Sequence, residues 1–180
     1  MIRLFVALEL PQPVRMRLAM LGGGVPGAKW QGEDQIHLTL RFIGEVDEHV
    51  AHDIDDALAS VRSPAFKLEL IGVGTFGGRD PHALWAGVRP NEALFHLHRK
   101  IETALQRIGL PPESRKFAPH VSLAKLKRPP RDKLAEFIQQ HALFASGAIP
   151  IGQFVLYSSQ LGSGGSVYRI ERTYELLPSP

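Results

Sequence analysis

The sequence has 180 residues, of which 44% are hydrophobic and 22% are charged, and its formal net charge is +3 at pH 7. It contains no cysteine, which excludes disulfides, thiolate zinc sites and a cysteine nucleophile. Because no stretch approaches the roughly 20 apolar residues of a membrane span and the start lacks a signal-peptide layout, we expect a cytoplasmic protein without membrane contacts.

The first half of the chain is predicted to alternate strands with helices. Short apolar runs rich in branched and aromatic residues predict strands, and capping residues mark the starts of helices. The expected elements are strand 2–8, helix 11–21, strands 29–30 and 35–43, a helix from Asp47 to about Ser60, and strand 65–73. The glycine run 22–24 lacks the Lys-Ser or Lys-Thr of a P-loop, so nucleotide binding there is not favoured.

The second half repeats this order of elements. The expected elements are strand 82–88, a helix from Asn91 to about Ile108, strand 116–126, helix 129–141, and strands 149–158 and 167–176. Residues 162–165 are rich in glycine and predict the turn of a hairpin. The mild positive charge of the whole chain suits an acidic partner such as nucleic acid.

Two short stretches share one design: His37-Leu38-Thr39-Leu40 and His120-Val121-Ser122-Leu123. Successive side chains of a strand point to opposite faces, so each stretch presents an imidazole and a hydroxyl on one face and two apolar residues on the other. Chance placement of the 8 histidines would give well under one such match. Two adjacent strands of this kind would surround one cleft with groups suited to acid-base work on a phosphodiester.

The spacing of the two motifs predicts a duplicated fold. The two histidines are separated by 83 residues, close to half the chain. We therefore expect an α+β fold with pseudo-twofold symmetry and two βαβαβ-type lobes, in which antiparallel-rich sheets line a central groove and helices lie outside. Residues 1–180 would form one bilobal domain with two intertwined lobes and repeats at roughly 1–80 and 81–180.

Side chains near the motifs are candidates for substrate binding. Strict alternation in the first motif strand would place Arg41 on the face of His37 and Thr39, and Phe42 on the opposite face. Phe42 and Phe117 could stack a base or pack in the core. Basic residues gather around the second motif: Arg115, Lys116, Lys125, Lys127, Arg128, Arg131 and Lys133. They fit an RNA backbone track or a solvated surface equally well.

The motifs and several flanking runs resemble one known family. The runs that carry the resemblance are residues 2–8, 36–46, 84–88 and 119–124. Together they are similar to the RNA 2′,3′-cyclic phosphodiesterases, also called 2′-5′ RNA ligases, of the two-histidine phosphoesterase superfamily. The similarity extends over nearly the whole chain, and the set of runs in this order is far more specific than either tetrapeptide alone.

The resemblance implies a fold, a reaction and a set of residue roles. It implies a bilobal fold that converts a 2′,3′-cyclic phosphate RNA end to a 2′-phosphate without a metal or other cofactor. We expect the protein to be a monomer. In some members it also implies reversible 2′-5′ joining of tRNA halves. The implied roles are His37 as proton donor, His120 as proton acceptor, and Thr39 and Ser122 as hydrogen-bond partners of the phosphate.

The sequence departs from the family pattern at two positions. Ser122 stands where threonine is more usual, which keeps the hydroxyl. Lys125 stands where relatives often carry arginine, and lysine binds phosphate as a point charge without the fork of guanidinium. Strict alternation would aim Lys125 away from His120, so its role requires a bend in the strand.

Three alternatives remain open from the residues. The paired histidines could be hydrogen-bonded core residues. A cluster at helical spacing could instead hold a metal for a phosphohydrolase, since imidazole and carboxylate are ordinary ligands, or it could be a solvated helix face: His49, His52, Asp53 and Asp56. A third possibility is a non-catalytic RNA-binding module, which turnover of a cyclic nucleotide would distinguish from an enzyme.

Overall fold

The computed structural model describes residues 1–179 of the chain. The strands are β1 (Ile2–Glu9), β2 (Ala28–Trp30), β3 (His37–Val46), β4 (Phe66–Phe76), β5 (Ala83–Val88), β6 (His120–Leu126), β7 (Ala145–Ile151), β8 (Gln153–Gly162) and β9 (Gly165–Glu175). The helices are α1 (Gln12–Met20), the 3-10 turn η1 (Glu33–Gln35), α2 (Glu48–Ala59), α3 (Glu92–Arg107) and α4 (Arg131–Gln140).

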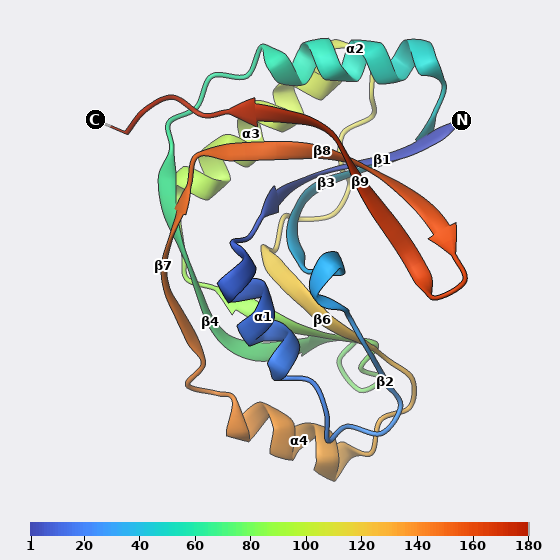
Figure 1. The fold of residues 1–180 in the computed structure, drawn as a ribbon, viewed down its shortest axis with the longest axis vertical. Helices are drawn as coiled ribbons and strands as arrows, with labels where there is room; N and C mark the ends of the chain where they lie inside the picture. Colours follow the sequence, from blue (N-terminus) through green and yellow to red (C-terminus); the bar gives the residue numbers. More distant parts are fainter. Residues whose placement is uncertain (180) are drawn as a thin grey trace.

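The strands form one curled antiparallel sheet. Its order is β7-β4-β5-β6-β3-β1-β8-β9, with β2 paired to β6. Figure 1 shows α2 and α3 together at one end of the molecule and α4 at the other. The predicted α+β class with antiparallel strands and outer helices is confirmed.

The middle of the sheet is its weakest junction. β3 and β6 are joined through a single residue pair, Leu38 with Val121. On either side of this junction the sheet mixes strands of both chain halves, because β4 pairs with β5 and β8 pairs with β1. The division into two repeats near residue 80 stays a prediction.

Alternation along the central strands separates two apolar layers. On β1, Leu4, Val6 and Leu8 belong to the main core, whereas Phe5 and Ala7 pack in a smaller cluster on the other face. Burying each large apolar side chain contributes roughly 1.5–3 kcal/mol, so the alternation determines which face carries the helices. No helix within residues 1–179 is long and apolar enough to cross a membrane.

The two predicted helix caps are confirmed, and two predicted strands differ. Asp47 accepts a hydrogen bond from the Val50 amide, and Asn91 accepts one from the Leu94 amide. The expected strand 149–158 is two strands, because the chain leaves β4 and joins β1 at Gly152. The second motif strand begins at His120 rather than at residue 116.

Candidate active site

The sheet brings the two sequence motifs together. The pair that joins β3 to β6 is Leu38 with Val121, the residue after each motif histidine. Both of these side chains are fully buried in the main core. Because neighbours in a strand face opposite ways, the histidines on the two strands lie on the other face of the sheet.

A cavity of about 330 Å³ lies on that face, and we call it the histidine cavity. It is lined by both motifs and by two residues that follow them: His37, Thr39, Phe42, His120, Ser122 and Lys125. The four motif residues predicted from the sequence are therefore neighbours around one space.

His37 is held in one orientation by its surroundings. Its Nδ1 lies 2.8 Å from the carbonyl oxygen of Gln35, and its Nε2 lies 2.9 Å from Oγ1 of Thr39. A carbonyl oxygen only accepts, so Nδ1 carries the proton and donates. The neutral ring therefore accepts the Thr39 hydroxyl at Nε2, the nitrogen that is available for chemistry.

Burial lowers the pKa of His37 to about 4. The hydrogen bond to the Gln35 carbonyl acts in the opposite direction, and positive charge on His120 lowers this pKa further. The rings of Phe5 and Tyr168, centred 5.0 and 5.3 Å away, exclude water from the imidazole. His37 is therefore neutral near pH 7 when the cavity holds no anion.

His120 repeats the backbone contact of His37. Its Nδ1 donates to the carbonyl oxygen of Ala118 at 2.7 Å, again two residues earlier in the chain. The ring of Phe76 packs edge-on against His120 with centroids 4.8 Å apart. The same tautomer follows, so both imidazoles keep Nε2 for a group bound between them.

β3 is irregular immediately after its hydroxyl residue. Thr39 is paired with β1, but the next paired residue is Arg41, so Leu40 has no partner of its own. An extra residue of this kind moves the following side chains to the opposite face. Phe42 thus lines the histidine cavity, where it is 60% exposed, although the sequence placed it on the other face.

β6 contains the same irregularity at the equivalent position. Ser122 pairs with β5, the next paired residue is Ala124, and Leu123 is skipped. Lys125 therefore lines the histidine cavity with His120 and Ser122. The skipped residue Leu123 is the irregularity that Lys125 needs in order to face His120. It brings a cation to the cavity.

The structure corrects the expected position of Arg41. Its side chain is 6% exposed, and Nη1 donates to both carboxylate oxygens of Glu102 on α3 at 2.6 Å. Nη2 donates to the carbonyl oxygen of Pro111, in the loop between α3 and β6. The residue skipped after Thr39 is the physical reason for this position. Because its guanidinium is occupied, Arg41 positions the loop that leads to Ala118 and His120.

A second hollow of about 450 Å³, the aromatic pocket, shares Thr39, Phe42 and His120 with the histidine cavity. Its other side chains include Arg41, Phe76, Arg115, Lys116 and Phe117, so Arg41 borders this pocket although it does not line the histidine cavity. Phe117 is stacked on His98 with centroids 3.9 Å apart, so one of its faces is already covered. The side chain of Arg115 is 84% exposed, and its Nε lies 3.8 Å from Oε1 of Glu113.

The basic cluster around the second motif is divided by the fold. Lys125 lines the histidine cavity, and Arg115 and Lys116 line the aromatic pocket. The remaining members line neither hollow: Lys127, Arg128, Arg131 and Lys133. The RNA backbone track through all seven residues stays a prediction.

Several residues that line the histidine cavity lie outside the two sequence motifs. They come from β1, the segment before β3, and the β8–β9 hairpin: Arg3, Gln31, Gln35, Ser159, Ser166 and Tyr168. Tyr168 meets the His37 ring edge-on, and Gln35 Nε2 donates to the Ser166 carbonyl at 2.7 Å. The predicted turn at 162–165 was the available signal, but it does not say which strand the hairpin joins.

The alternative metal cluster does not assemble. His52 and Asp56 on α2 are 3.6 Å apart and largely exposed. In the part of the chain that the structure describes, no three histidine, aspartate or glutamate side chains gather closely enough to hold a metal ion. The α2 cluster is a solvated helix face.

Solved structures share this architecture. The crystal structure of TT0787 of Thermus thermophilus aligns with a TM-score of 0.80 at 26% identity, covering 96% of this chain and 97% of that one. The crystal structure of E. coli LigT complexed with 3′-AMP aligns with a TM-score of 0.76 at 25% identity, covering 97% of each chain. The chain therefore has the LigT-like fold.

Sequence comparison gives the family. The RNA 2′,3′-cyclic phosphodiesterase of Aeropyrum pernix is 34% identical over 158 residues, which cover 86% of this chain and 89% of that protein. The protein of the same name from Thermotoga maritima is 31% identical over 176 residues, covering 93% and 92%. Residues 15–162 match the family model of the 2′-5′ RNA ligase superfamily. The chain belongs to this superfamily, which confirms the resemblance seen in its sequence.

Proposed function

We propose that this protein hydrolyses RNA ends that carry a 2′,3′-cyclic phosphate and leaves a 2′-phosphate, with His37 and His120 as the acid-base pair. The observation that carries the proposal is one cavity lined by two imidazoles, each held through Nδ1 by the carbonyl two residues earlier. The names of the relatives support the substrate class.

Opening the cyclic phosphate requires two proton transfers. Water attacks phosphorus as its proton passes to Nε2 of His120, and the bond from phosphorus to the 3′-oxygen breaks as His37 donates a proton to that oxygen. The oxygen of water stays on phosphorus, which yields the 2′-phosphate. Positioned acids and bases of this kind each contribute about 10²–10⁴ in rate.

Polar groups beside the histidines would stabilise the charged transition state. The hydroxyls of Thr39 and Ser122 and the ammonium of Lys125 line the same cavity, where they would contact the non-bridging phosphate oxygens. Preorganised donors and cations at such positions lower the barrier electrostatically. The proposal therefore needs no metal ion or other cofactor.

The role of His37 as donor requires a bound anion. An opposite charge close to an imidazole favours the protonated ring. We expect the pKa of His37 to rise from about 4 in the free protein when a nucleoside 2′-phosphate occupies the cavity, by roughly 1 to 3. Binding would take up a proton between the two pKa values, so affinity should increase as the pH falls through this interval.

NMR titration of the imidazole resonances measures this change directly. His49, exposed at the start of α2, is the control, and its resonance should not move when the nucleotide is added. A His37 pKa that stays unchanged or falls in the complex would contradict the donor role.

The same pair could join RNA ends. If a 5′-hydroxyl replaced water, His120 would take its proton and the product would be a 2′-5′ linkage. The aromatic pocket borders His120 and could receive the nucleoside that carries this hydroxyl. The halves of a cleaved tRNA are candidate substrates. The proposed unit is a monomer, since a single chain supplies both motif histidines and both motif hydroxyls of the histidine cavity.

The test supplies RNA ending in a 2′,3′-cyclic phosphate to the protein in excess EDTA and identifies the product isomer. We expect complete conversion to the 2′-phosphate, with a rate that falls at both acid and alkaline pH because one imidazole must be protonated and the other neutral.

Two outcomes would contradict the proposal. Loss of turnover in EDTA, with recovery on adding a divalent cation, would favour metal-dependent hydrolysis. Tight RNA binding without any turnover would favour the non-catalytic RNA-binding alternative.

A further inference from the structure

A third hollow, of about 490 Å³, lies between the C-terminal end of α2 and the side of α3, and we call it the α2–α3 groove. These two helices lie together at one end of the molecule (Figure 1). The charged side chains that line the groove are Arg62, Arg99, Lys100 and Arg107, with His96 beside them. Among the described residues no aspartate or glutamate lines it.

The cations of the groove lack acidic partners. Within residues 1–179, Arg62, Arg99, Lys100 and Arg107 form no ion pair. Arg62 donates through Nη1 to the carbonyl oxygens of Ala59 and Val61, which leaves its other nitrogens available. With no acidic partner among the described residues, these cations are available to a polyanion.

The remaining lining suits phosphate groups. The hydroxyl of Thr103 faces the same hollow and can donate a hydrogen bond, whereas the Ser60 hydroxyl already donates to the Ala57 carbonyl. Guanidinium presents paired donors that match two phosphate oxygens, and three of the four cations are arginines. A chain of phosphates spaced along the groove would be contacted by several cations at once.

We propose that the α2–α3 groove binds the phosphate backbone of the RNA whose end enters the histidine cavity, an inference that rests on the proposed function. The loop 108–119 connects the two sites, because it begins directly after Arg107 and carries Arg115 and Lys116 to the aromatic pocket. A strand that leaves the cavity along this loop meets the groove at Arg107. The groove is thus a second RNA contact, separate from the reacting phosphate.

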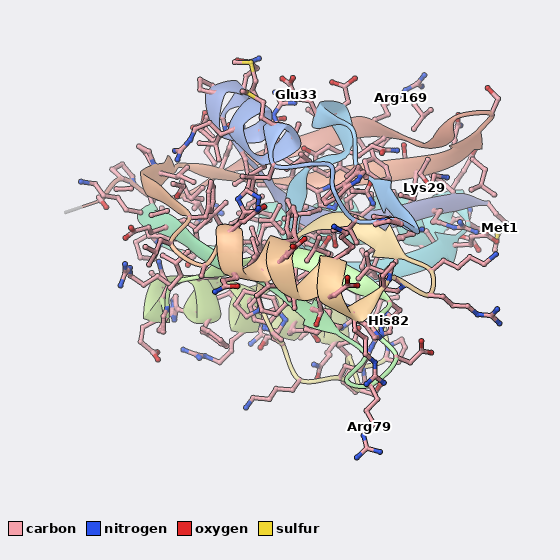
Figure 2. All side chains as sticks on the ribbon, turned by 90° about the horizontal axis from the view of Figure 1, so that it is seen from below. Met1, Lys29, Glu33, Arg79, His82 and Arg169 are labelled. Carbon is pink, nitrogen blue, oxygen red and sulfur yellow. The ribbon has the colours of Figure 1, made fainter. Side chains whose placement is uncertain are left out.

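The test compares two double variants that each remove two exposed cations. Arg99→Ser/Arg107→Ser alters the groove, and Lys67→Ser/Arg79→Ser is the control. Neither control residue lines a described hollow, and Arg79 projects into solvent (Figure 2). Fluorescence anisotropy measures binding of a single-stranded RNA of about 16 nucleotides with a 3′-hydroxyl, near the upper site size of single-strand binders, at several salt concentrations.

We expect the groove variant to bind this RNA about tenfold more weakly at low salt. The slope of log affinity against log salt should fall by about 1.4, since each lost single-strand phosphate contact contributes roughly 0.7. Binding of a dinucleotide, which the proposed function places in the histidine cavity and the aromatic pocket, should be equal in the two variants.

Equal affinities and slopes in the groove variant and the control would overturn the proposal. So would binding of pyrophosphate that depends on Arg99 and Arg107 when RNA binding does not, because the ligand would then be a free phosphate compound. The measurement requires no turnover, so its failure is distinguishable from failure of the proposed hydrolysis. Thermal melting verifies that both variants fold.

Discussion

Replacing His120 with alanine is expected to lower kcat/KM for hydrolysis of a 2′,3′-cyclic nucleotide by about 10²–10⁴. The variant loses the acceptor that the Ala118 carbonyl holds in place, so water must attack without a base. His37→Ala should cost a similar factor through loss of the acid. The double variant should lose less than the product of the two factors, because residues that act as a unit are not additive.

Initial rates measured on one substrate with EDTA present check this expectation. His49→Ala on α2 removes an exposed imidazole and is the matched control, with an expected rate equal to wild type. Full activity in either motif variant, or a 3′-phosphate product from the wild-type protein, would show that the two rings do not have the assigned roles.

Replacing Glu102 with alanine is expected to destabilise the protein by about 3–5 kcal/mol, because it leaves the buried charge of Arg41 without its partner. The side chains of this pair are only 6% and 12% exposed. The lost carboxylate also accepts from the Glu113 amide at 3.5 Å, so the loop before β6 loosens as well. Urea unfolding measures the change in free energy.

An exposed ion pair provides the comparison. Lys133 and Glu136 on α4 are 3.4 Å apart with side chains 49% and 62% exposed, and Glu136→Ala should cost less than about 1 kcal/mol. If Glu102→Ala costs no more than Glu136→Ala, the Arg41 contact does not hold the loop. Arg41→Lys keeps the positive charge but loses the paired guanidinium donors. This variant should therefore retain only part of the stability that the contact between Arg41 and Glu102 provides.

Strand alternation predicted the site as far as the strands are regular. From His37 to Thr39 and from His120 to Ser122 each strand is undistorted, so the imidazole and hydroxyl share a face as the sequence indicated. The helix caps were also visible, because Asp47 and Asn91 act through contacts within a single turn.

Alternation failed after the skipped leucines because the register of a strand depends on its neighbour. Nothing in the residues around Leu40 or Leu123 distinguishes a leucine that is paired from one that is not. The positions of Phe42, Lys125 and Arg41 all follow from these two irregularities. Likewise, the predicted strand 149–158 is divided at Gly152 because β7 pairs with β4 and β8 pairs with β1. Both of these partner strands lie far away in the sequence.

The pairing of β8 with β1 constrains how this molecule is made. Val6 pairs with Leu156, so the side of the sheet that carries His37 is incomplete until residue 156 has been synthesised. Contacts between such distant residues give a high contact order, which slows folding. Neither half of the chain is expected to fold alone, and the emerging N-terminal strand must stay unpaired on one edge until the C-terminal hairpin leaves the ribosome.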